Sequence, residues 1–576
     1  MNIGGMWCSD PRGMPGGFDC ERPGLGLMLT PHVRVLQDAR HLLVIEGEAF
    51  DINVTDALAD PRRLYSAYGL FTYVWFDNQE RKTVIGTDRL GYSPLYYAGD
   101  SQSIRFSTSL THLKSAIPVR TPDYAAWEEL SVLGELLGEK TTVREIRRAD
   151  YGMTLEFVDG RMSVRRYWEP DVPPLVDYAT YVRRNNELLD EAMSFLRSQT
   201  RPQAVALSGG EDSRRIADAA VRQGLPVSFW TQEAIQKGDI DKDTHLAREV
   251  AALLDRPFNV VPMPTDDQFF RDCEERDTLL GFESLAHEWM FELLRHLPPN
   301  CLVYDGIIGD VSINGHYFKA FPSAVDGFSD TRALAQAICG PYEAKWWLEE
   351  IRRRAETRLV DRVQAALERC PNSPHRLTYY FLLNHTRRRI ALAAQIFNQQ
   401  GHWTCYPYSY PPLLLQSLSL DARIAAVKFM QRECLAAISP RSVSVPTTRG
   451  EVPARFVRNM RGVNARRQTY MRKRLNISPG ALDAFPQLRG RARVTPVLQL
   501  PGFAPALRRY GWFIEHVARF SEFLDWLGSN DAGRMLLRPL PGRRSAGRNE
   551  ASPAASLPET WSPRTGAIGA DRSTPG

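Results

Sequence analysis

The sequence lacks the features that would mark a membrane, secreted or zinc-binding protein. No apolar run approaches the roughly 18 residues that a membrane-spanning helix needs. The first residues, Met1 to Cys8, contain no charged segment followed by an apolar one, as a secretion signal would. The eight cysteines lie far apart, with no Cys-x-x-Cys pair and no Cys/His spacing typical of zinc. We therefore expect a protein of the reducing cytoplasm that has no membrane segment.

The sequence also has little excess charge. Its formal net charge is +5 over 576 residues, and arginine-rich stretches occur late, between residues 461 and 493. Hydrophobic residues make up 43% and charged residues 24%, values typical of globular domains. This mild bias favours a solvated basic face over a nucleic-acid site. At about 150 residues per domain, the length predicts two to four domains.

One segment carries a candidate phosphate-binding loop. Ala204-Val-Ala-Leu-Ser-Gly-Gly-Glu-Asp-Ser213 is an apolar, strand-like run that passes through two glycines into residues with helical spacing. Such a turn points successive backbone N–H groups and the positive end of a helix at one anion. A Walker loop would instead place a lysine against the outer phosphates. The candidate nucleotide-binding residues are Leu207, Ser208, Gly209, Gly210, Glu211, Asp212 and Ser213.

The order of strand-like and helix-like segments predicts the domain organisation. Short β-rich runs fill residues 30–168, strands and helices then alternate, and residues 340–440 have a helical pattern. We therefore expect an α/β protein in four parts: a sheet-rich domain at 1–172, a parallel-sheet domain with a helical C-terminal subdomain at 173–455, a helical basic extension at 456–540 and a disordered tail at 541–576.

The loop at 207–213 resembles the Ser-Gly-Gly-x-Asp-Ser pyrophosphate loop of N-type ATP pyrophosphatases, and in particular the asparagine synthetase family. The resemblance implies an adenine nucleotide alpha hydrolase-like domain that binds ATP, with Asp212 helping to hold Mg²⁺. In that family a substrate carboxylate attacks the α-phosphate of ATP, and an amine then captures the acyl-adenylate. ATP and Mg²⁺ are therefore the implied cofactors.

A block in the first domain resembles the glutamine amidotransferase domain of asparagine synthetases. Asp88-Arg89, Gly91 and Pro94-Leu-Tyr-Tyr97 recur there in the same order and spacing, which implies an Ntn-hydrolase-like αββα sandwich. The family nucleophile is a cysteine directly after the initiator methionine, but this chain has Asn2. The family's Asn-Gly-Glu element appears as Glu46-Gly47-Glu48, with a carboxylate in place of a neutral amide. We expect this domain to have lost glutaminase activity and to persist as a scaffold.

A second segment, Tyr304-Asp-Gly-Ile-Ile-Gly-Asp310-Val-Ser-Ile-Asn-Gly315, resembles the family's Gly-Glu-Gly-x-Asp-Glu element. The resemblance implies that Asp310 binds Mg²⁺ and that Gly309 lies beside the nucleotide, although Asp310 could instead cap a helix. The family's two glutamates fall at Ile307 and Val311. The base that deprotonates the amine must therefore come from elsewhere or from the substrate.

A third segment, Lys428-Phe-Met-Gln-Arg-Glu433, resembles the Lys-x-x-Leu-Arg-Glu stretch before the family's catalytic loop, which makes Lys428 a candidate catalytic residue. The lysine that stabilises the leaving pyrophosphate in the family falls at Thr447. Arg449 could supply the missing charge, or it could be a solvated loop arginine. By family analogy, the strand end at Thr231 forms a wall of the adenosine pocket.

These features predict an asparagine synthase-like, ATP-dependent carbon–nitrogen ligase. It would adenylate a small-molecule or peptide carboxylate and form an amide with ammonia or a substrate amine. β-Lactam synthetases and lasso peptide cyclases are relatives with an inactive first domain, so a lasso peptide or other natural-product macrocyclase is an alternative. A non-catalytic ATP-binding scaffold is another, because Ile307, Val311 and Thr447 depart from the family pattern. The expected partners are the acid and the amine donor, without membrane or nucleic acid, and a homodimer is left open.

Overall fold

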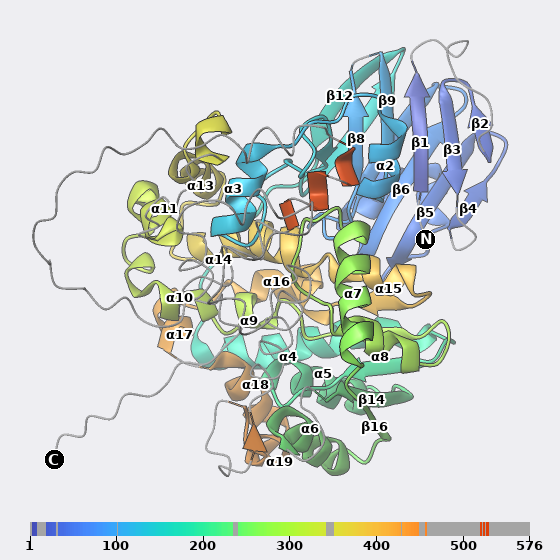
Figure 1. Ribbon diagram of the computed structural model, residues 1–576. Coiled ribbons are helices and arrows are strands. Elements are labelled where there is room, and N and C mark those ends of the chain that lie inside the picture. Colours follow the sequence, from blue (N-terminus) through green and yellow to red (C-terminus); the bar gives the residue numbers. More distant parts are fainter. Residues whose placement is uncertain are drawn as a thin grey trace, which may run out of the picture.

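The computed structural model describes residues 3–8, 19–29, 33–100, 102–233, 240–340, 351–427, 429–448, 456–457, 519–520, 522–524 and 526–528. They form an antiparallel sandwich, a parallel sheet and a group of helices that connects the two (Figure 1). The predicted tail at 541–576 and most of the predicted extension at 456–540 lie outside the described residues.

The sandwich consists of two six-stranded sheets with the strand orders β10-β8-β9-β1-β3-β2 and β12-β11-β7-β6-β5-β4. The strands are β1 (Ile3–Cys8), β2 (Cys20–Arg22), β3 (Leu25–Leu29), β4 (Arg34–Gln37), β5 (His41–Ala49), β6 (Gly69–Asp77), β7 (Lys82–Thr87), β8 (Tyr96–Gly99), β9 (Ser103–Ser107), β10 (Arg147–Arg148), β11 (Met153–Val158) and β12 (Arg161–Arg166). Neighbouring strands are antiparallel.

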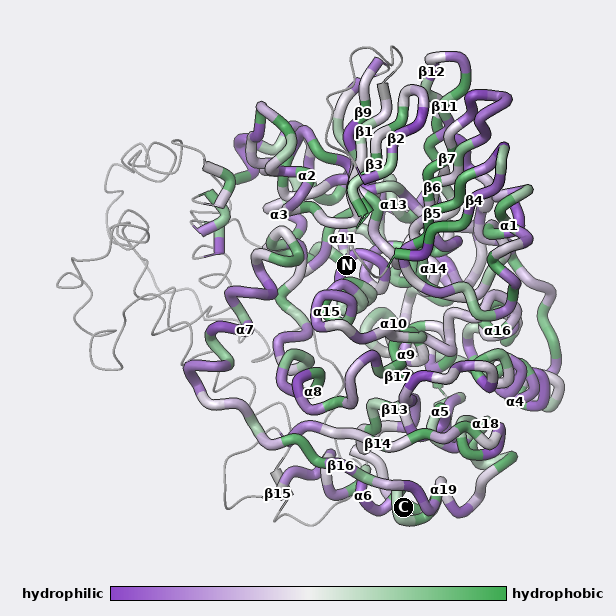
Figure 2. Tube along the Cα trace, turned by 90° about the vertical axis from the view of Figure 1, so that its right-hand side faces the viewer, coloured by the Kyte–Doolittle hydropathy of each residue, from purple (hydrophilic) through white to green (hydrophobic). Residues whose placement is uncertain are grey.

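The sequence of β6 shows why its sheet packs against a hydrophobic core on each face. Successive strand residues point to opposite faces. Val74 and Phe76 enter the core between the sheets, whereas Tyr73 and Trp75 enter a second cluster beneath α1 (Asp56–Ala59) and η2 (Pro61–Ser66). Helices α2 (Leu110–Ala116) and α3 (Tyr124–Val132) belong to the same part of the chain. Hydrophobic residues accordingly run along β5, β6 and β7, while the outer helix α7 is largely hydrophilic (Figure 2).

The second sheet has five parallel strands in the order β16-β14-β13-β17-β18. The strands are β13 (Gln203–Ala206), β14 (Val227–Gln232), β16 (Phe258–Val261), β17 (Leu302–Tyr304) and β18 (Trp403–Cys405). A parallel sheet is what the alternation of strands and helices predicts. The edge strand β18 lies inside the stretch 340–440, for which we expected a helical pattern. Its three residues are too few for a strand period to be visible in the sequence.

Helices flank the parallel sheet and join it to the sandwich. They are α4 (Tyr178–Ser194), η3 (Phe195–Ser198), α5 (Glu211–Arg222), α6 (Lys242–Leu253), α7 (Asp266–Leu279), α8 (Met290–His296), α9 (Gly309–Ser312), α10 (His316–Ala320), η4 (Pro322–Ala324), α11 (Thr331–Cys339), α13 (Leu359–Glu368), α14 (Arg376–Phe381), η5 (Leu382–Ile390), α15 (Ala393–Gln399), η6 (Pro407–Ser409), α16 (Pro411–Ser417), α17 (Ala422–Val427), α18 (Met430–Ile438) and α19 (Pro440–Ser444). The element η5 is a π-helix. A small parallel pair joins β15 (Ile240–Asp241) to β19 (Phe456–Val457).

The described part of the predicted extension includes a helical segment that packs at the junction of the two sheets. Phe520 and Phe523 lie 4.9 Å and 5.1 Å from the ring of Trp127 in α3, measured between ring centroids. Phe523 also lies 5.8 Å from Phe282, which follows α7. Arg519 forms a buried ion pair with Asp277 of α7 at 2.9 Å. These late residues therefore pack against both the sandwich part and the parallel-sheet part of the chain.

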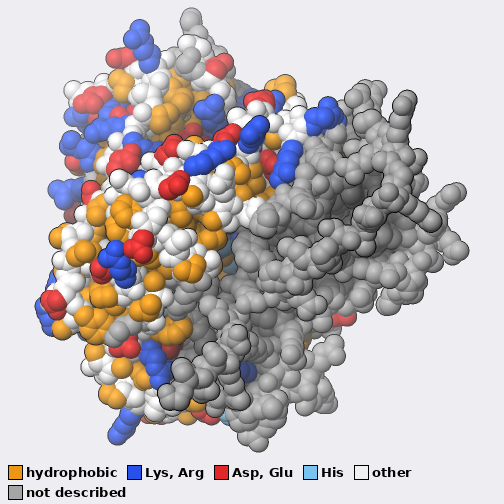
Figure 3. Space-filling model, turned by 90° about the vertical axis from the view of Figure 1, so that its left-hand side faces the viewer, with side chains coloured by type: hydrophobic (Ala, Val, Ile, Leu, Met, Phe, Trp, Pro, Cys, Tyr) orange, Lys and Arg blue, Asp and Glu red, His pale blue; other side chains and the backbone are white. Residues whose placement is uncertain are grey.

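The described surface carries charges of both signs. Basic and acidic side chains are interspersed over the described part of the face in Figure 3. Within the described residues, the helices are too short or too polar to span a lipid bilayer.

Candidate active site

The candidate phosphate loop lies at the point where the connections of the parallel sheet change direction. From β13 the chain proceeds to β14 and β16 on one side, and later to β17 and β18 on the other side. Residues 207–210 follow β13, and residues 305–308 follow its neighbour β17. Ligands of open α/β sheets bind in the crevice at the carboxyl ends of such neighbouring strands. The first two predicted loops are therefore brought together at this edge.

Internal hydrogen bonds hold the loop in shape. The Ser208 amide donates to the Ser213 hydroxyl at 3.0 Å, and the Gly210 amide donates to the Ser208 hydroxyl at 3.2 Å. The Gly209 amide donates to the carboxylate of Asp243 at 2.7 Å. The protein itself thus satisfies three of the amides that we expected to face an anion, and an incoming phosphate would compete with those bonds.

The two loop glycines are required for close packing. Neither residue has a positive φ. A Cβ atom on Gly209 would lie 2.8 Å from a carboxylate oxygen of Asp243 and 3.0 Å from the Thr448 methyl carbon. A Cβ atom on Gly210 would lie 3.2 Å from the Ser208 hydroxyl. The glycines therefore admit neighbouring groups into the turn.

Two carboxylates occupy the start of the following helix. Glu211 and Asp212 lie in the first turn of α5, and Gly210 precedes them without a side-chain cap. The positive end of a helix attracts these carboxylates as well as phosphate. A polyphosphate at this position would consequently need a divalent cation between its oxygens and the carboxylates.

Asp212 is oriented by residues that the sequence analysis did not identify. Gln431 of α18 donates from its side-chain amide to an Asp212 carboxylate oxygen at 2.7 Å. The Tyr408 hydroxyl donates to the Asp212 carbonyl at 2.9 Å. Gln431 in turn accepts from the buried Arg215 at 2.8 Å. The sequence did contain a signal for Gln431. In the segment 428–433 this residue stands where the family's Lys-x-x-Leu-Arg-Glu stretch has leucine.

Asp310 belongs to the same network. Asn314 donates from its side chain to an Asp310 carboxylate oxygen at 3.4 Å and accepts from the backbone N–H of Gln431 at 3.0 Å. Asp310 lies in the first turn of α9, whose N-cap position is Ile308, so it is not the cap residue that we considered as an alternative. One relay, formed by the side chain and the backbone N–H of Gln431 and by the side chain of Asn314, therefore connects the two candidate magnesium ligands, Asp212 and Asp310.

The turn before α9 lies directly against the phosphate loop. A Cβ atom on Gly309 would lie 2.5 Å from an Asp212 carboxylate oxygen, and one on Gly306 would lie 3.0 Å from the Ser213 amide nitrogen. The buried Ile308 has φ 87°, a region that β-branched residues avoid. By the spacing of the resemblance, Ile308 stands at the family's second glycine. Backbone strain of this kind is typical of functional sites.

The loop after α19 also reaches this crevice. Buried Arg214 of α5 donates to the carbonyls of Val445 and Pro446 at 2.6 Å and 2.9 Å, and to the Gly209 carbonyl at 3.3 Å. Thr447 is buried next to Thr448, whose carbonyl accepts from Lys242 at 2.7 Å.

The remaining predicted site residues have different positions. Thr231 is buried near the end of β14 and pairs with Val260 of β16. The predicted catalytic residues Lys428 and Arg449 lie outside the described residues. Lys242, which donates to Thr448, is a described basic residue that contacts the loop after α19, and the sequence analysis did not identify it.

The donor set is consistent with magnesium that is bound mainly through substrate oxygens. Within the described ranges there is no group of three or more His, Cys, Asp or Glu side chains arranged to hold a metal ion. Magnesium in nucleotide sites commonly takes one or two carboxylates, with phosphate oxygens and water as the other ligands. Asp212 and Asp310 provide that number of carboxylates.

The Glu46 carboxylate is buried in the sandwich. It accepts from the Ile3 amide at 2.8 Å and from the Thr108 hydroxyl at 2.7 Å. Burial raises the pKa of Glu46 from 4.5 to about 7, against the lowering effect of these two bonds. The neighbouring Glu48 forms ion pairs with Arg34 and Arg201. Glu46 thus anchors strand β1, and Glu48 anchors Arg201, which lies just before β13.

We predict that Glu46→Gln stabilises the protein at alkaline pH. A carboxyl whose pKa is higher in the folded state binds extra protons there, so stability falls as the pH rises from about 4.5 to 7 and stays low above that range. Glutamine keeps an acceptor for both bonds and cannot ionise, and the gain should approach about 3 kcal/mol at pH 8 and vanish near pH 4.5. Urea unfolding at pH 5 and pH 8 measures this, with the exposed Glu80→Gln as control. An equal effect at both pH values would contradict it.

Comparison with known proteins identifies the class of the first domain. Residues 60–168 match the family model described as a glutamine amidotransferase domain. The chain thus carries a glutamine amidotransferase-like domain, and this domain resembles the one found in the asparagine synthetase family. A relative is the putative asparagine synthetase [glutamine-hydrolyzing] 2 of Methanocaldococcus jannaschii, which is 25% identical over 154 residues. That alignment covers 26% of this chain and 30% of the relative, so it spans less than a third of the relative's length.

Two solved structures share weaker likeness. One is the allosteric regulatory enzyme of purine biosynthesis, 10% identical, with coverage of 46% of this chain and 80% of that chain at a TM-score of 0.18. The other is glutamine phosphoribosylpyrophosphate amidotransferase from B. subtilis complexed with ADP and GMP, 11% identical, with coverage of 53% and 81% at a TM-score of 0.18. At such scores the likeness carries no weight for the arrangement of the elements.

Proposed function

We propose that this chain is an ATP-dependent carbon–nitrogen ligase of the asparagine synthetase kind. It adenylates a substrate carboxylate, releases pyrophosphate and AMP, and forms an amide with ammonia or a substrate amine. The relay Asp212–Gln431–Asn314–Asp310 is the observation that carries the proposal, because it places two oriented carboxylates at the switch point of a parallel sheet. The strand order of that sheet also supports an adenine nucleotide alpha hydrolase-like domain.

The residues of the crevice have distinct roles in this proposal. The start of α5 and the hydroxyls of Ser208 and Ser213 bind the phosphates, after the loop exchanges some of its internal hydrogen bonds. Asp212 and Asp310 hold Mg²⁺, which would neutralise the phosphate oxygens. Lys242 is placed near the loop at which the family has its lysine, and it can oppose the charge of the leaving pyrophosphate.

Asp305 is the group that we assign to accept the proton of the attacking amine. It follows β17 directly, two residues before Ile307, where the family has its glutamate. Its carboxylate accepts from the Ile307 amide at 3.2 Å and forms no ion pair with any residue that the structure describes. Burial raises the pKa of Asp305 to about 6, a value suited to a base near neutral pH.

This assignment predicts a pH profile. Amide formation should rise with pH through a midpoint near pH 6 and then reach a plateau, because only the ionised Asp305 accepts a proton. Asp305→Asn should lower the rate of amide formation by about 100-fold and remove this inflection, while adenylation continues. Single-turnover assays with preformed acyl-adenylate separate the two steps. An unchanged profile in the variant would assign the base to the substrate.

The proposed function is tested by magnesium-dependent exchange of pyrophosphate into ATP across a panel of carboxylic acids. Exchange with at least one acid supports the ligase. Tight ATP binding without exchange supports a non-catalytic scaffold, and absence of ATP binding contradicts both. Ile307 and Val311 stand where the family has glutamates, and their apolar side chains favour the macrocyclase alternative. A substrate that carries its own amine depends less on protein groups to position and deprotonate that amine. A peptide acid that exchanges and then loses water without added ammonia would identify it.

A further inference from the structure

A cavity of about 440 Å³ lies between the sandwich and the helical part of the chain. One wall is the segment 137–151, which contains β10 and leads into β11. The other wall comes from α13, from residues 369–370 after it and from the start of η5. Pockets for small molecules commonly have this size and often lie between domains. No residue of the loops at 207–213 or 305–310 lines it, so it is separate from the proposed nucleotide site.

The charges that line the cavity do not balance. Five basic side chains face three carboxylates; the basic ones are Lys140, Arg144, Arg147, Arg362 and Arg369, and the acidic ones are Asp123, Glu139 and Asp150. Pairing with neighbours does not remove the excess. Pairing adds four carboxylates, because Arg362 binds Glu128 and Glu129, Arg144 binds Glu356 and Arg166 binds Glu169. It also adds three cations, namely Arg352 beside Glu128 and Arg166 and Arg387 at Asp150. The lining and its paired neighbours therefore keep a surplus of positive charge.

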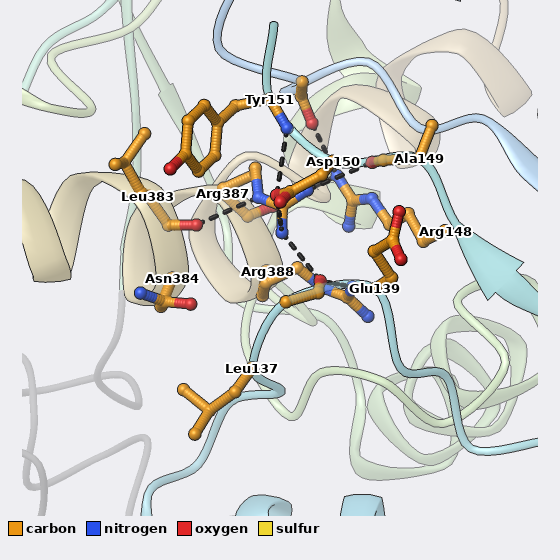
Figure 4. Close-up of polar contacts among 12 residues, drawn as sticks. Leu137, Glu139, Arg148, Ala149, Asp150, Tyr151, Leu383, Asn384, Arg387 and Arg388 are labelled. Atoms are coloured by element: carbon orange, nitrogen blue, oxygen red, sulfur yellow. Dashed lines mark hydrogen bonds and ion pairs between the residues drawn. The ribbon is translucent and has the colours of Figure 1, made fainter. Parts of the chain in front are cut away.

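Asp150 shows this surplus most clearly. Its buried carboxylate is contacted by Arg166 at 3.0 Å, by Arg387 at 3.0 Å and also by Arg369. Although burial acts in the opposite direction, these guanidinium groups hold the pKa of Asp150 well below its usual range. Figure 4 shows Arg387 between Asp150 and Leu383, with backbone carbonyls as its other acceptors. Three cations thus contact one carboxylate at this wall, and of the three Arg166 also binds Glu169, so the wall is positively charged.

The remaining lining is apolar or aromatic. Leu137 and Ile146 come from the sandwich side, and Ala366 and Leu383 come from the helical side. Tyr151 offers an aromatic ring, with the Arg166 and Arg369 guanidinium groups 4.6 Å and 5.5 Å from its centroid. Arg147 and Ala365 are exposed at the edge of the cavity, so a ligand can reach it from solvent. An anion that also has a hydrophobic body would match both kinds of lining.

We propose that this cavity binds a small organic dianion, either a phosphomonoester or a dicarboxylate, with an apolar or aromatic body. Such a ligand would neutralise the positive excess and would fill the space between the two walls. It would also join the sandwich to the helical part, because its charge would contact arginines of both. The proposal does not depend on the proposed ligase activity.

Calorimetric titration of the full chain with phenyl phosphate and with phthalate tests the proposal, and benzyl alcohol serves as the uncharged control. We expect one of the two dianions to bind in the micromolar to low millimolar range, and the preferred one identifies the anionic group. Arg147→Ala should weaken binding about tenfold, since it removes a charge-assisted contact. The substitution keeps the backbone pairing of residue 147 with Tyr97 in β8, so we expect the fold to be retained. The exposed Arg183→Ala in α4 should bind as the parent chain does.

A blocking variant makes the test specific to the cavity. Ala365→Trp places a large side chain at its edge from an exposed helix position, and it should abolish binding of the probe. Saturating ATP should not displace the probe, because the two sites share no residue. The proposal is overturned if neither dianion binds, if benzyl alcohol binds equally well, or if both variants bind like the parent chain.

Discussion

Asp212→Asn is expected to lower magnesium-dependent ATP–pyrophosphate exchange by at least about 100-fold. Asparagine keeps an oxygen that can accept from Gln431 at the 2.7 Å position, so the relay and the local shape survive. The substitution removes the negative charge that a magnesium ion on the phosphates requires. Loss of an electrostatic group of this kind typically costs 100- to 1000-fold in rate. ATP binding in the absence of magnesium should change little.

The matched control is Asp177→Asn. Asp177 is also an aspartate at the start of a helix, where it caps α4, and asparagine caps equally well. Its exchange rate should equal that of the parent chain. Asp310→Asn should resemble Asp212→Asn, because the two carboxylates are parts of one relay. Retention of most exchange activity by both site variants would remove the magnesium assignment from these residues.

Asp150→Asn is expected to destabilise the folded protein by about 3 to 5 kcal/mol. The substitution leaves the buried Arg387 and its neighbours Arg166 and Arg369 without their shared carboxylate. Removal of one partner from a buried ion pair costs about this much, since the remaining charge stays out of water. Urea unfolding with tryptophan fluorescence measures the loss. The surface variant Asp159→Asn should have no effect beyond about 0.5 kcal/mol.

The pH dependence of this loss follows from the direction of the shift. Because the pKa of Asp150 is lower in the folded state, its carboxylate stabilises the fold fully at pH values above the unfolded pKa of 3.8. This stabilisation is lost only as the pH falls towards the lower pKa of the folded state. The deficit of Asp150→Asn should therefore be the same at pH 6 and pH 8. A double-mutant cycle with Arg387→Met should give a coupling of about 1 to 3 kcal/mol. A deficit that grows between pH 6 and 8, or zero coupling, would show that another group is responsible.

Local sequence determined the parts of this protein that short-range physics controls. The apolar run before Ser208 and the helical spacing after it indicate a strand, a turn and a helix, and they occur as β13 and α5. The nearly continuous apolar run of β6 similarly indicates a strand that is packed on both faces. Each of these conclusions needs only neighbours within about ten residues.

Tertiary structure alone decided which distant side chains meet. Gln431 reaches Asp212 across 219 positions, and Arg387 approaches Asp150 from a π-helix far along the chain. Sequence periodicity reports which face of an element is apolar, but it does not say which polar groups become partners. The partners of a buried charge are set by packing, because an unpaired charge in the interior is costly wherever the chain places it. The relay of the candidate site and the positive wall of the second cavity therefore became visible only once the elements were packed together.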